Sequence, residues 1–208
     1  MSLSWLKMTA VIACVGLLSA CSGGGSAKHT TAQQDANQNL NNKNIVFTVV
    51  DLSLIADANL RQCIEEIGAK ETIHQNLNCS RRGITSLRGI EQFQDLRVLD
   101  LSHNQLSNID ELSQLSRLSS LYINDNQIYD LSALEKLSAL TKLVANNNQI
   151  QSIDALENSK VRQLYLNNNQ ISNLAVINSL ASLENFTAEN NRASFPHSMP
   201  KSLKTYSL

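Results

Sequence analysis

The chain has 208 residues, of which 42% are hydrophobic and only 4% aromatic, and its 17 basic and 18 acidic residues leave a net charge of −1. Leucine, serine and asparagine are in excess, with 31, 25 and 24 copies. A short unit copied many times is the usual cause of such a composition. The length allows one modest domain with appendages and excludes a large multidomain enzyme. The even charge balance leaves no basic stripe for nucleic acid.

Residues 1–20 have the pattern of an export signal. Lys7 and the amino terminus form a basic start, an apolar stretch runs from Met8 to Leu18, and small residues follow it. The apolar stretch is too short to span a bilayer comfortably. The ending Leu18-Ser19-Ala20-Cys21 resembles the bacterial lipobox. This resemblance implies cleavage before Cys21 and acylation of that cysteine, with palmitate among the expected lipids.

The lipobox resemblance also implies a location. Two or three acyl chains anchor a protein stably, whereas a single chain binds only marginally. Ser22 follows the cysteine, and the sorting rule of such lipoproteins reserves inner-membrane retention mainly for Asp at that position. We therefore expect a lipid-anchored protein of the bacterial cell envelope, in the outer membrane where the host has one. The alternatives are an ordinary cleaved signal with an incidental cysteine, or a buried apolar helix.

Residues 21–44 are expected to be the lipidated cysteine and a flexible tether. The chain after Cys21 is rich in Gly and Ser and then in Gln, Asn and Asp, and Leu40 is its only strongly apolar residue. Such a segment cannot bury enough apolar surface to become ordered. The tether would hold the folded domain away from the membrane.

Residues 74–208 repeat the pattern Leu-x-x-Leu-x-Leu-x-x-Asn-x-Leu. Its units begin, at spacings of 20 to 22 residues, at His74, Leu96, Leu118, Leu140, Val161, Leu183 and Leu203. The asparagine of the pattern recurs as Asn104, Asn126, Asn148, Asn169 and Asn191. This is the signature of a leucine-rich-repeat solenoid, in which each turn is a short strand plus a return segment. The expected fold is an α/β-type solenoid, a right-handed coil with a concave parallel β-sheet.

The pattern also predicts how the coils hold together. Leu99 and Leu101 alternate with Asp100, so this strand buries one face. The later leucines of each unit close the core from the convex side. Each asparagine follows a strand where the chain turns inward, and a buried amide there would pair backbone groups of adjacent turns. The repeated asparagines are therefore predicted to form a structural ladder.

The units resemble the internalin-like class of short bacterial repeats, particularly in Asn-Gln-Ile followed by Ser-x-Ile or Asp-x-Leu-Ser. In that family a helical cap seals the first coil, and residues 45–73 look similar. A helix is predicted from Asp57, which would cap it, to Gly68, which would end it. Four residues recur at helical spacing and are expected to face the first coil, namely Leu60, Cys63, Ile64 and Ile67.

Three units depart from the pattern. The first has Arg82 in place of the asparagine and His74 in place of a leucine, which suits a capping turn. The unit from Leu140 is one residue short, so its return segment is expected to be irregular. The last strand, at residues 203–208, has no obvious cap. An uncovered strand edge is a pairing liability or a docking site.

Two cysteines besides Cys21 remain in the exported chain. Cys79 occupies a position that leucine or isoleucine holds in other units, and Cys63 lies on the apolar face of the predicted helix. An exported protein tolerates a disulfide, and this one would close a loop of 16 residues, worth ~3 kcal/mol in the chain-entropy model. Two buried reduced thiols are the alternative. No zinc site is expected, because the four histidines show no ligand spacing with the cysteines.

No catalytic motif occurs in the sequence. It contains no glycine-rich phosphate loop, no His-Glu-x-x-His and no Gly-x-Ser-x-Gly. The Asp and Ser residues fall mostly at repeat positions that are expected to be exposed. We therefore expect no enzymatic activity, no cofactor, no metal, no small-molecule substrate and no nucleic-acid partner.

The outward positions of the predicted strands are the candidate binding surface. Most are polar, but four are not and should cluster across adjacent strands, namely Val98, Tyr122, Val144 and Tyr165. Exposed aromatic residues on a rigid sheet have the properties of binding hot spots. Asp100 and Lys142 would supply polar contacts at the rim. The alternative is that tyrosine simply suits strand faces.

These features predict a membrane-anchored leucine-rich-repeat module that binds a protein partner through its concave face. The alternative is a structural envelope lipoprotein that self-associates by its C-terminal edge strand or attaches to the cell wall. Architecture alone does not decide between these functions. Solution mass distinguishes them, because a concentration-independent monomer disfavours edge association.

Replacing Cys21 with Ser should produce an unacylated protein that loses its lipid-dependent membrane attachment, because acylation requires the thiol. Metabolic labelling with a fatty-acid analogue, followed by membrane fractionation, measures both properties. A wild-type protein that takes up no label would contradict the lipobox interpretation.

Overall fold

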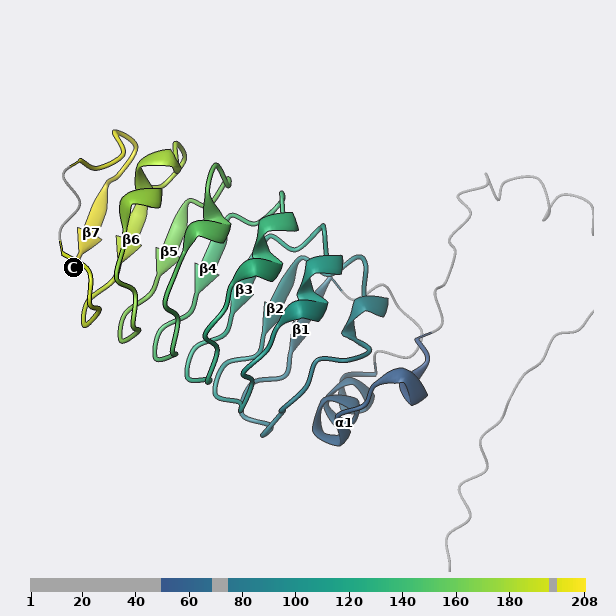
Figure 1. Ribbon diagram of the computed structural model, residues 1–208. Helices are drawn as coiled ribbons and strands as arrows, with labels where there is room; N and C mark the ends of the chain where they lie inside the picture. The colour runs from purple at the N-terminus through teal and green to yellow at the C-terminus, as the bar shows by residue number, and fades with distance from the viewer. Residues whose placement is uncertain (1–49, 69–74, 195–197) are drawn as a thin grey trace, which may run out of the picture. The chain divides into compact units, whose positions relative to one another are not determined.

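The computed structural model describes residues 50–68, 75–194 and 198–208. The predicted signal peptide, Cys21 and the tether lie outside the described residues, as does His74 at the start of the first unit. Short strands and short helical turns alternate along most of the described chain (Figure 1). None of the helices in these three ranges is long and apolar enough to cross a membrane.

Seven strands form one parallel sheet, with neighbours in chain order. They are β1 (Asn76–Asn78), β2 (Val98–Asp100), β3 (Ser120–Tyr122), β4 (Lys142–Val144), β5 (Gln163–Tyr165), β6 (Asn185–Thr187) and β7 (Thr205–Ser207). Each strand pairs with the strand one repeat unit later, so that Leu99 lies beside Leu121 and Leu121 beside Leu143. The stacked coils and the parallel sheet that the repeat predicted are thus confirmed.

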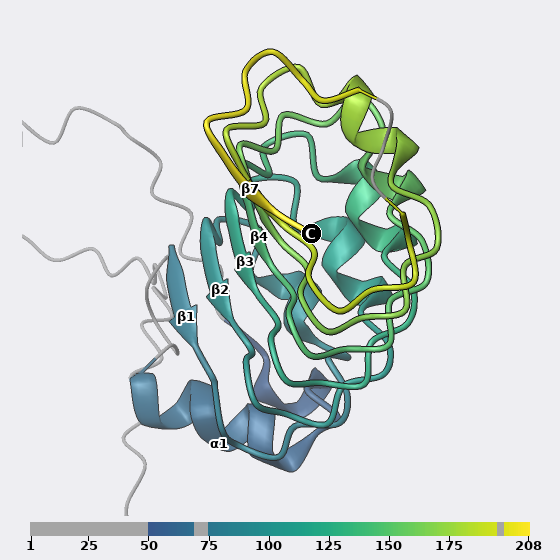
Figure 2. The same ribbon diagram turned by 90° about the vertical axis from the view of Figure 1, so that its left-hand side faces the viewer.

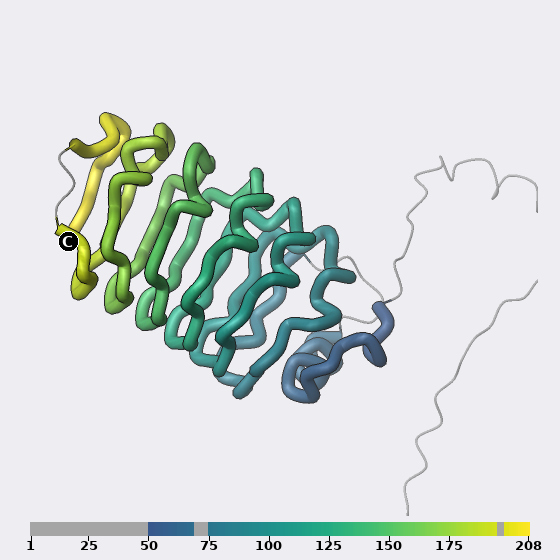
Figure 3. The backbone as a smooth tube through the Cα atoms, in the orientation of Figure 1, coloured from purple at the N-terminus to yellow at the C-terminus, as the bar shows by residue number. Residues whose placement is uncertain are grey.

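The return segments carry short 3-10 helices. These are η2 (Ile90–Gln92), η3 (Asp110–Gln114), η4 (Ser132–Lys136), η5 (Asp154–Leu156) and η6 (Ala175–Ser179), and η1 (Leu52–Leu54) precedes the repeats. The strands run along one side of the coils and the helical turns along the other, as Figure 2 shows and the tube in Figure 3 traces. The core lies between these layers. Its strand side is formed by the central residues of β1 to β6, each 0–1% exposed: Leu77, Leu99, Leu121, Leu143, Leu164 and Phe186.

The asparagines of the repeat hydrogen-bond the backbone of two successive coils. The Oδ1 atom of Asn148 accepts from the Ile128 N–H at 3.0 Å, and its Nδ2 donates to the carbonyls of Ile123 and Ala145 at 2.9 and 3.3 Å. Ala145 belongs to the same coil as Asn148, and the two isoleucines belong to the preceding one. The same arrangement recurs at Asn104, Asn126, Asn169 and Asn191. All are buried except Asn191, which is half-buried beside the last coil.

The residue before each ladder position has a left-handed backbone, a feature that the repeat pattern did not predict. The φ angles are 54–58° at Arg81, His103, Asp125, Asn147, Asn168 and Asn190. Asparagine and aspartate adopt this region more readily than most other non-glycine residues, which explains the pairs of adjacent asparagines in the sequence. Their side chains also join the coils: Asn147 Nδ2 donates to Asp125 Oδ1 at 2.8 Å, and Asn168 Nδ2 donates to Asn147 Oδ1 at 2.6 Å.

Asp57 joins the start of helix α1 (Ala58–Ile67) to the first coil. Its Oδ1 accepts from the N–H groups of Asn59 and Leu60 at 2.9 and 3.0 Å, which caps the helix. Its Oδ2 accepts from the N–H and hydroxyl of Thr85 at 2.8 and 2.9 Å and from the Ser86 N–H at 3.2 Å. Burial raises the pKa of Asp57, but the hydrogen bonds outweigh it and hold the pKa below the ordinary value.

Helix α1 ends at Gly68, which has a φ of 75° and a left-handed backbone. Leu60, Cys63 and Ile64 are buried, as predicted. Ile67 was expected on the same face, but 39% of it is exposed. This expectation is wrong because the apolar contact of α1 with the first coil ends one turn earlier.

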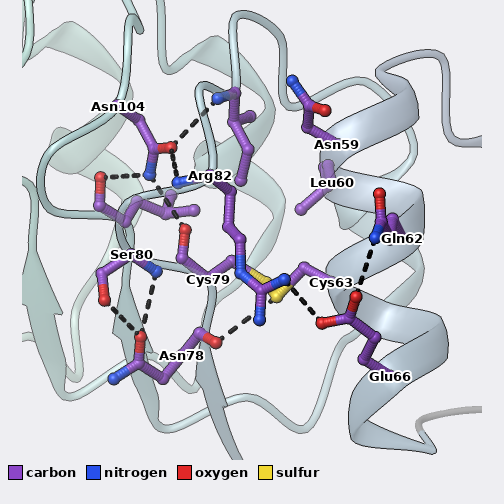
Figure 4. Close-up of a disulfide and its surroundings, with 12 residues drawn as sticks. Asn59, Leu60, Gln62, Cys63, Glu66, Asn78, Cys79, Ser80, Arg82 and Asn104 are labelled. Atoms are coloured by element: carbon purple, nitrogen blue, oxygen red, sulfur yellow. Dashed lines mark hydrogen bonds and ion pairs between the residues drawn. A yellow bond between two sulfur atoms is a disulfide. The ribbon is translucent and has the colours of Figure 1, made fainter.

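Cys63 and Cys79 form a disulfide that ties α1 to the coil of β1, with their Cα atoms 5.8 Å apart and both residues fully buried. Beside it, Arg82 Nη1 pairs with Glu66 Oε2 at 2.5 Å, and Gln62 donates to the other Glu66 oxygen at 2.8 Å (Figure 4). Arg82 thus takes the ladder position of the first coil with a side chain that reaches the cap helix. The charge pair is exposed and adds little stability compared with the disulfide.

Gly89 allows the segment before α1 to lie directly on the first coil. Its φ is 99°, and a Cβ atom there would lie 2.7 Å from the Ile55 Cα and 2.7 Å from the Leu54 carbonyl oxygen. The neighbouring Ala56 N–H donates to the Arg88 carbonyl at 3.2 Å. Any side chain at position 89 would therefore push the cap away from the core.

The short unit from Leu140 and the last strand depart from the regular coil for separate reasons. In the short unit, η5 has three residues where η3, η4 and η6 have five, and Asn158 beyond it has a φ of 56°. In β7, Tyr206 pairs in register with the buried Phe186 but is 54% exposed. Among the coils that the structure describes, none packs over this last strand.

Replacing Asn148 with Ala should lower the free energy of unfolding by about 1–3 kcal/mol, because the buried Ile128 N–H loses its acceptor. Gln149→Ala is the matched control. Gln149 is exposed on the same turn, so its truncation should cost less than about 0.5 kcal/mol. Urea denaturation measures both values, and equal losses would contradict the role of the ladder.

Replacing Asp57 with Asn should lower the free energy of unfolding by about 1–3 kcal/mol at pH 7, because an amide nitrogen then faces N–H and O–H donors. The folded-state pKa of Asp57 lies below its unfolded value. Its contribution is therefore present above the unfolded pKa, near pH 4, and is lost as the pH falls through the folded pKa. The difference between wild type and variant should shrink in acid. Urea denaturation at neutral and acidic pH tests this, and a constant difference would contradict it.

Candidate interaction surface

Tyr122, Val144 and Tyr165 form one column on the outward face of the sheet, because the register pairs each with the next across β3, β4 and β5. Asp100 on β2 precedes Tyr122 in the same column. The candidate residues Val98 and Lys142 lie in the column beside it. The six residues that the repeat alignment singled out are thus on adjacent strands, and we refer to them as the sheet-face patch: Val98, Asp100, Tyr122, Lys142, Val144 and Tyr165.

The patch side chains are half-buried, whereas the sequence favoured exposed aromatic rings. The cause is the close spacing of the strands, about 4.8 Å, at which neighbouring side chains cover one another. Tyr129, which follows the ladder position Asn126, is 54% exposed. The tyrosines of the patch are therefore held by their neighbours in a way that Tyr129 is not.

Lys142 lies over the ring of Tyr122, with its Nζ atom 5.1 Å from the ring centroid. This is within the range of a cation–π interaction. Lys142 was expected to supply a polar contact at the rim, and the structure places its ammonium over an aromatic ring of the patch. The contact is diagonal: it joins neighbouring strands and neighbouring columns. Such a pair follows from the register of the sheet and not from any spacing along one strand.

The asparagines that directly follow the strands serve the fold. Asn124 Oδ1 accepts from the Asn146 N–H at 2.9 Å, and Asn146 Oδ1 accepts from the Asn167 N–H at 2.8 Å. Asn167 Oδ1 in turn accepts from the Glu189 N–H at 2.8 Å. This second row of bonds between coils was missed at the sequence level, although the recurrence of asparagine at this position was a signal for it. The row borders the patch and fixes its edge.

Charges of opposite sign flank the patch. The residues at and just before the first positions of β2 to β5 carry five cations and one carboxylate, namely Arg97, Arg117, Lys142, Lys160, Arg162 and Asp95. On the opposite side, Asp100 is the last residue of β2, and Asp125 lies beyond the end of β3 with its Oδ2 3.3 Å from His103 Nδ1. Arg117 pairs with Asp95, and Arg162 with Glu184. Among the residues that the structure describes, Arg97, Lys142 and Lys160 make no ion pair.

Arg162 also belongs to a charged cluster that lies before β5 to β7. Glu184 pairs with Lys204 at 2.6 Å and with Arg162, and these hydrogen bonds, that of Lys204 first, lower the pKa of Glu184. Ser182 and Ser202 line the hollow beside it. All of its charges are paired at the surface, so the cluster links three coils. In the three described ranges, no group of three or more His, Cys, Asp or Glu residues is placed to hold a metal ion.

Comparisons with known proteins agree with this architecture. Residues 76–128 match the family model described as leucine rich repeat, and residues 116–158 match the model described as leucine rich repeats (2 copies). No curated protein matches the chain. Residues 76–158 thus match leucine-rich-repeat models, and the described coils have the fold of a leucine-rich-repeat solenoid. Proteins with such repeats commonly mediate protein–protein interaction and are typically non-enzymatic binding modules.

Solved structures with the same fold include proteins from two bacteria. An internalin, InlF, from Listeria monocytogenes is 22% identical, with a TM-score of 0.58 over 74% of this chain and 55% of its own. A leucine-rich-repeat protein from Leptospira interrogans is 28% identical, with a TM-score of 0.52 over 57% and 32%. The functional domain of InlJ from Listeria monocytogenes, which includes a cysteine ladder, is 19% identical, with a TM-score of 0.53 over 67% and 37%.

The chain spans about half the length of the first of these proteins. The internalin matches show the solenoid and its sheet, and identities near 20% carry no further argument about partners. The internalin-like repeats inferred from the sequence therefore have internalin-like structural neighbours.

Proposed function

We propose that the protein is a binding module that holds a protein partner on its sheet-face patch. The observation that carries this proposal is the column of Tyr122, Val144 and Tyr165, with the Lys142 ammonium over the first ring. Tyrosine presents a large apolar surface with a polar tip, and such side chains dominate the energetics of protein interfaces. Here they stand on strands whose positions are fixed by bonds from coil to coil, so binding would cost little ordering of the surface.

We further propose that acyl chains on Cys21 anchor the module in the bacterial cell envelope, in the outer membrane where one is present. The support is the sequence Leu18-Ser19-Ala20-Cys21 behind a short apolar stretch. Residues 22–44 would then give the repeats reach from the membrane to a partner. A disulfide at Cys63 and Cys79 is compatible with an exported protein.

The double variant Tyr122→Ala with Tyr165→Ala should remain folded and lose at least ~2 kcal/mol of binding free energy, because both rings of the column are removed. The assay is capture of envelope or host proteins on the immobilised full-length chain, followed by affinity measurement for each captured partner. Circular dichroism and urea denaturation of the variant establish that it is folded.

Tyr129→Ala is the matched control, because it removes a tyrosine that lies off the strands and is 54% exposed. It should bind every partner as the wild type does. A double variant that retains all partners would show that the sheet face is not the binding surface. The exposed edge of β7 at Tyr206 would then be the surface to examine, and the dependence of solution mass on concentration would test self-association there.

A further inference from the structure

The spacing of the residues in the sheet-face patch favours one backbone conformation of a protein partner, helical or extended, over the other. Neighbouring strands lie about 4.8 Å apart, so the column from Tyr122 to Tyr165 spans about 10 Å over its three strands. Helix positions i, i+3 or i+4 and i+7 share one face, and i and i+7 are about 10.5 Å apart along the axis. Side chains on one face of an extended strand recur about every 6.6 Å. A helix that crosses the strands therefore presents one side chain to each coil, and an extended peptide does not.

Backbone hydrogen bonding also favours a helix over an extended peptide. The backbone groups of the sheet are used between strands: the Leu101 N–H donates to the Tyr122 carbonyl and the Ile123 N–H to the Val144 carbonyl, both at 2.8 Å. The face of the sheet therefore offers no backbone hydrogen bonds to a peptide that lies across it. An extended peptide in that position would leave buried N–H and C=O groups unpaired. A helix satisfies its own backbone groups and needs only side-chain contacts.

The charges beside the patch indicate the polar residues of such a helix. The side of the patch where the strands begin is cationic, and Arg97 and Lys142 make no ion pair among the described residues. Lys142 is also half-buried against Tyr122, so its ammonium is held next to the apolar column. A partner carboxylate at this position would meet a cation that is already oriented. The opposite side carries Asp100 at the end of β2 and Asp125 in the turn after β3, and these carboxylates disfavour a second acidic flank.

We infer that the partner segment is an amphipathic helix that crosses β2 to β5, with apolar residues at i, i+3 or i+4 and i+7 on the column from Tyr122 to Tyr165, and with Asp or Glu on the flank that faces the strand starts, where one carboxylate pairs with Lys142. This inference rests on the proposed function, since it specifies the chemistry of a partner at the same surface. It implies that Lys142 selects acidic helices over basic ones.

Three short stapled helical peptides test the inference by fluorescence anisotropy with the full-length chain. The first has leucines at i, i+4 and i+7 and glutamates along one flank, the second has lysines in place of the glutamates, and the third has the composition of the first in shuffled order. The first should bind, more weakly as salt is added, and the other two should bind about tenfold more weakly or not at all. Lys142→Gln should weaken the first peptide about tenfold. The matched control is Lys136→Gln, which removes an exposed lysine of η4 and should change nothing.

Several results would overturn the inference. They are equal binding of the acidic and basic peptides, equal binding of the ordered and shuffled peptides, no binding of any peptide at millimolar concentration, or equal effects of Lys142→Gln and Lys136→Gln. A captured partner that needs Tyr122 and Tyr165 but is not displaced by the acidic helix would leave the proposed function standing and contradict the helix alone. A partner that does not need the tyrosines would contradict both.

Discussion

The buried amide after each strand is the interaction on which the rest of this structure depends. The chain turns inward there, and backbone groups such as the Ile128 N–H leave the sheet ladder inside the core, where an unpaired group would be costly. Asn148 provides an acceptor for that N–H and donors for carbonyls on its own and the preceding coil. One side chain thus pairs the backbone groups that the turn leaves without partners and links two coils. Leucines can fill the core only because the backbone polar groups of the turns are hydrogen-bonded in this way.

The outward surface is a consequence of this internal register. Each coil is fixed to the next by the ladder amide, by the strand pairing and by the outer row of Asn124, Asn146 and Asn167. Residues separated by one repeat unit are therefore brought into columns, and an aromatic residue on one strand gains a defined neighbour on the next. The position of Lys142 over Tyr122 depends on this register. A surface ordered before binding loses little entropy when a partner arrives.

Coils of a solenoid contact only their neighbours, so the exposed side of each terminal coil must be covered or stabilised separately. At the first coil, the Cys63–Cys79 disulfide, the carboxylate of Asp57 and the close approach at Gly89 join the cap to the core by covalent, polar and steric means. Arg82 replaces the ladder asparagine there and reaches α1. The last described strand has no such cover, and Tyr206 remains exposed in a column that is otherwise buried.

The sequence by itself determined the number of coils, the position of every strand, the inward leucines and the columns of the patch, because these follow from a period near 22 residues and from alternation within a strand. The capped helix was equally readable from Asp57 and Gly68. Only the tertiary structure decided that Lys142 covers Tyr122, that Asn147 and its equivalents have left-handed backbones, and that Ile67 is exposed. These features depend on distances between residues of different coils and on where packing ends. The periodicity of the sequence carries no information about either.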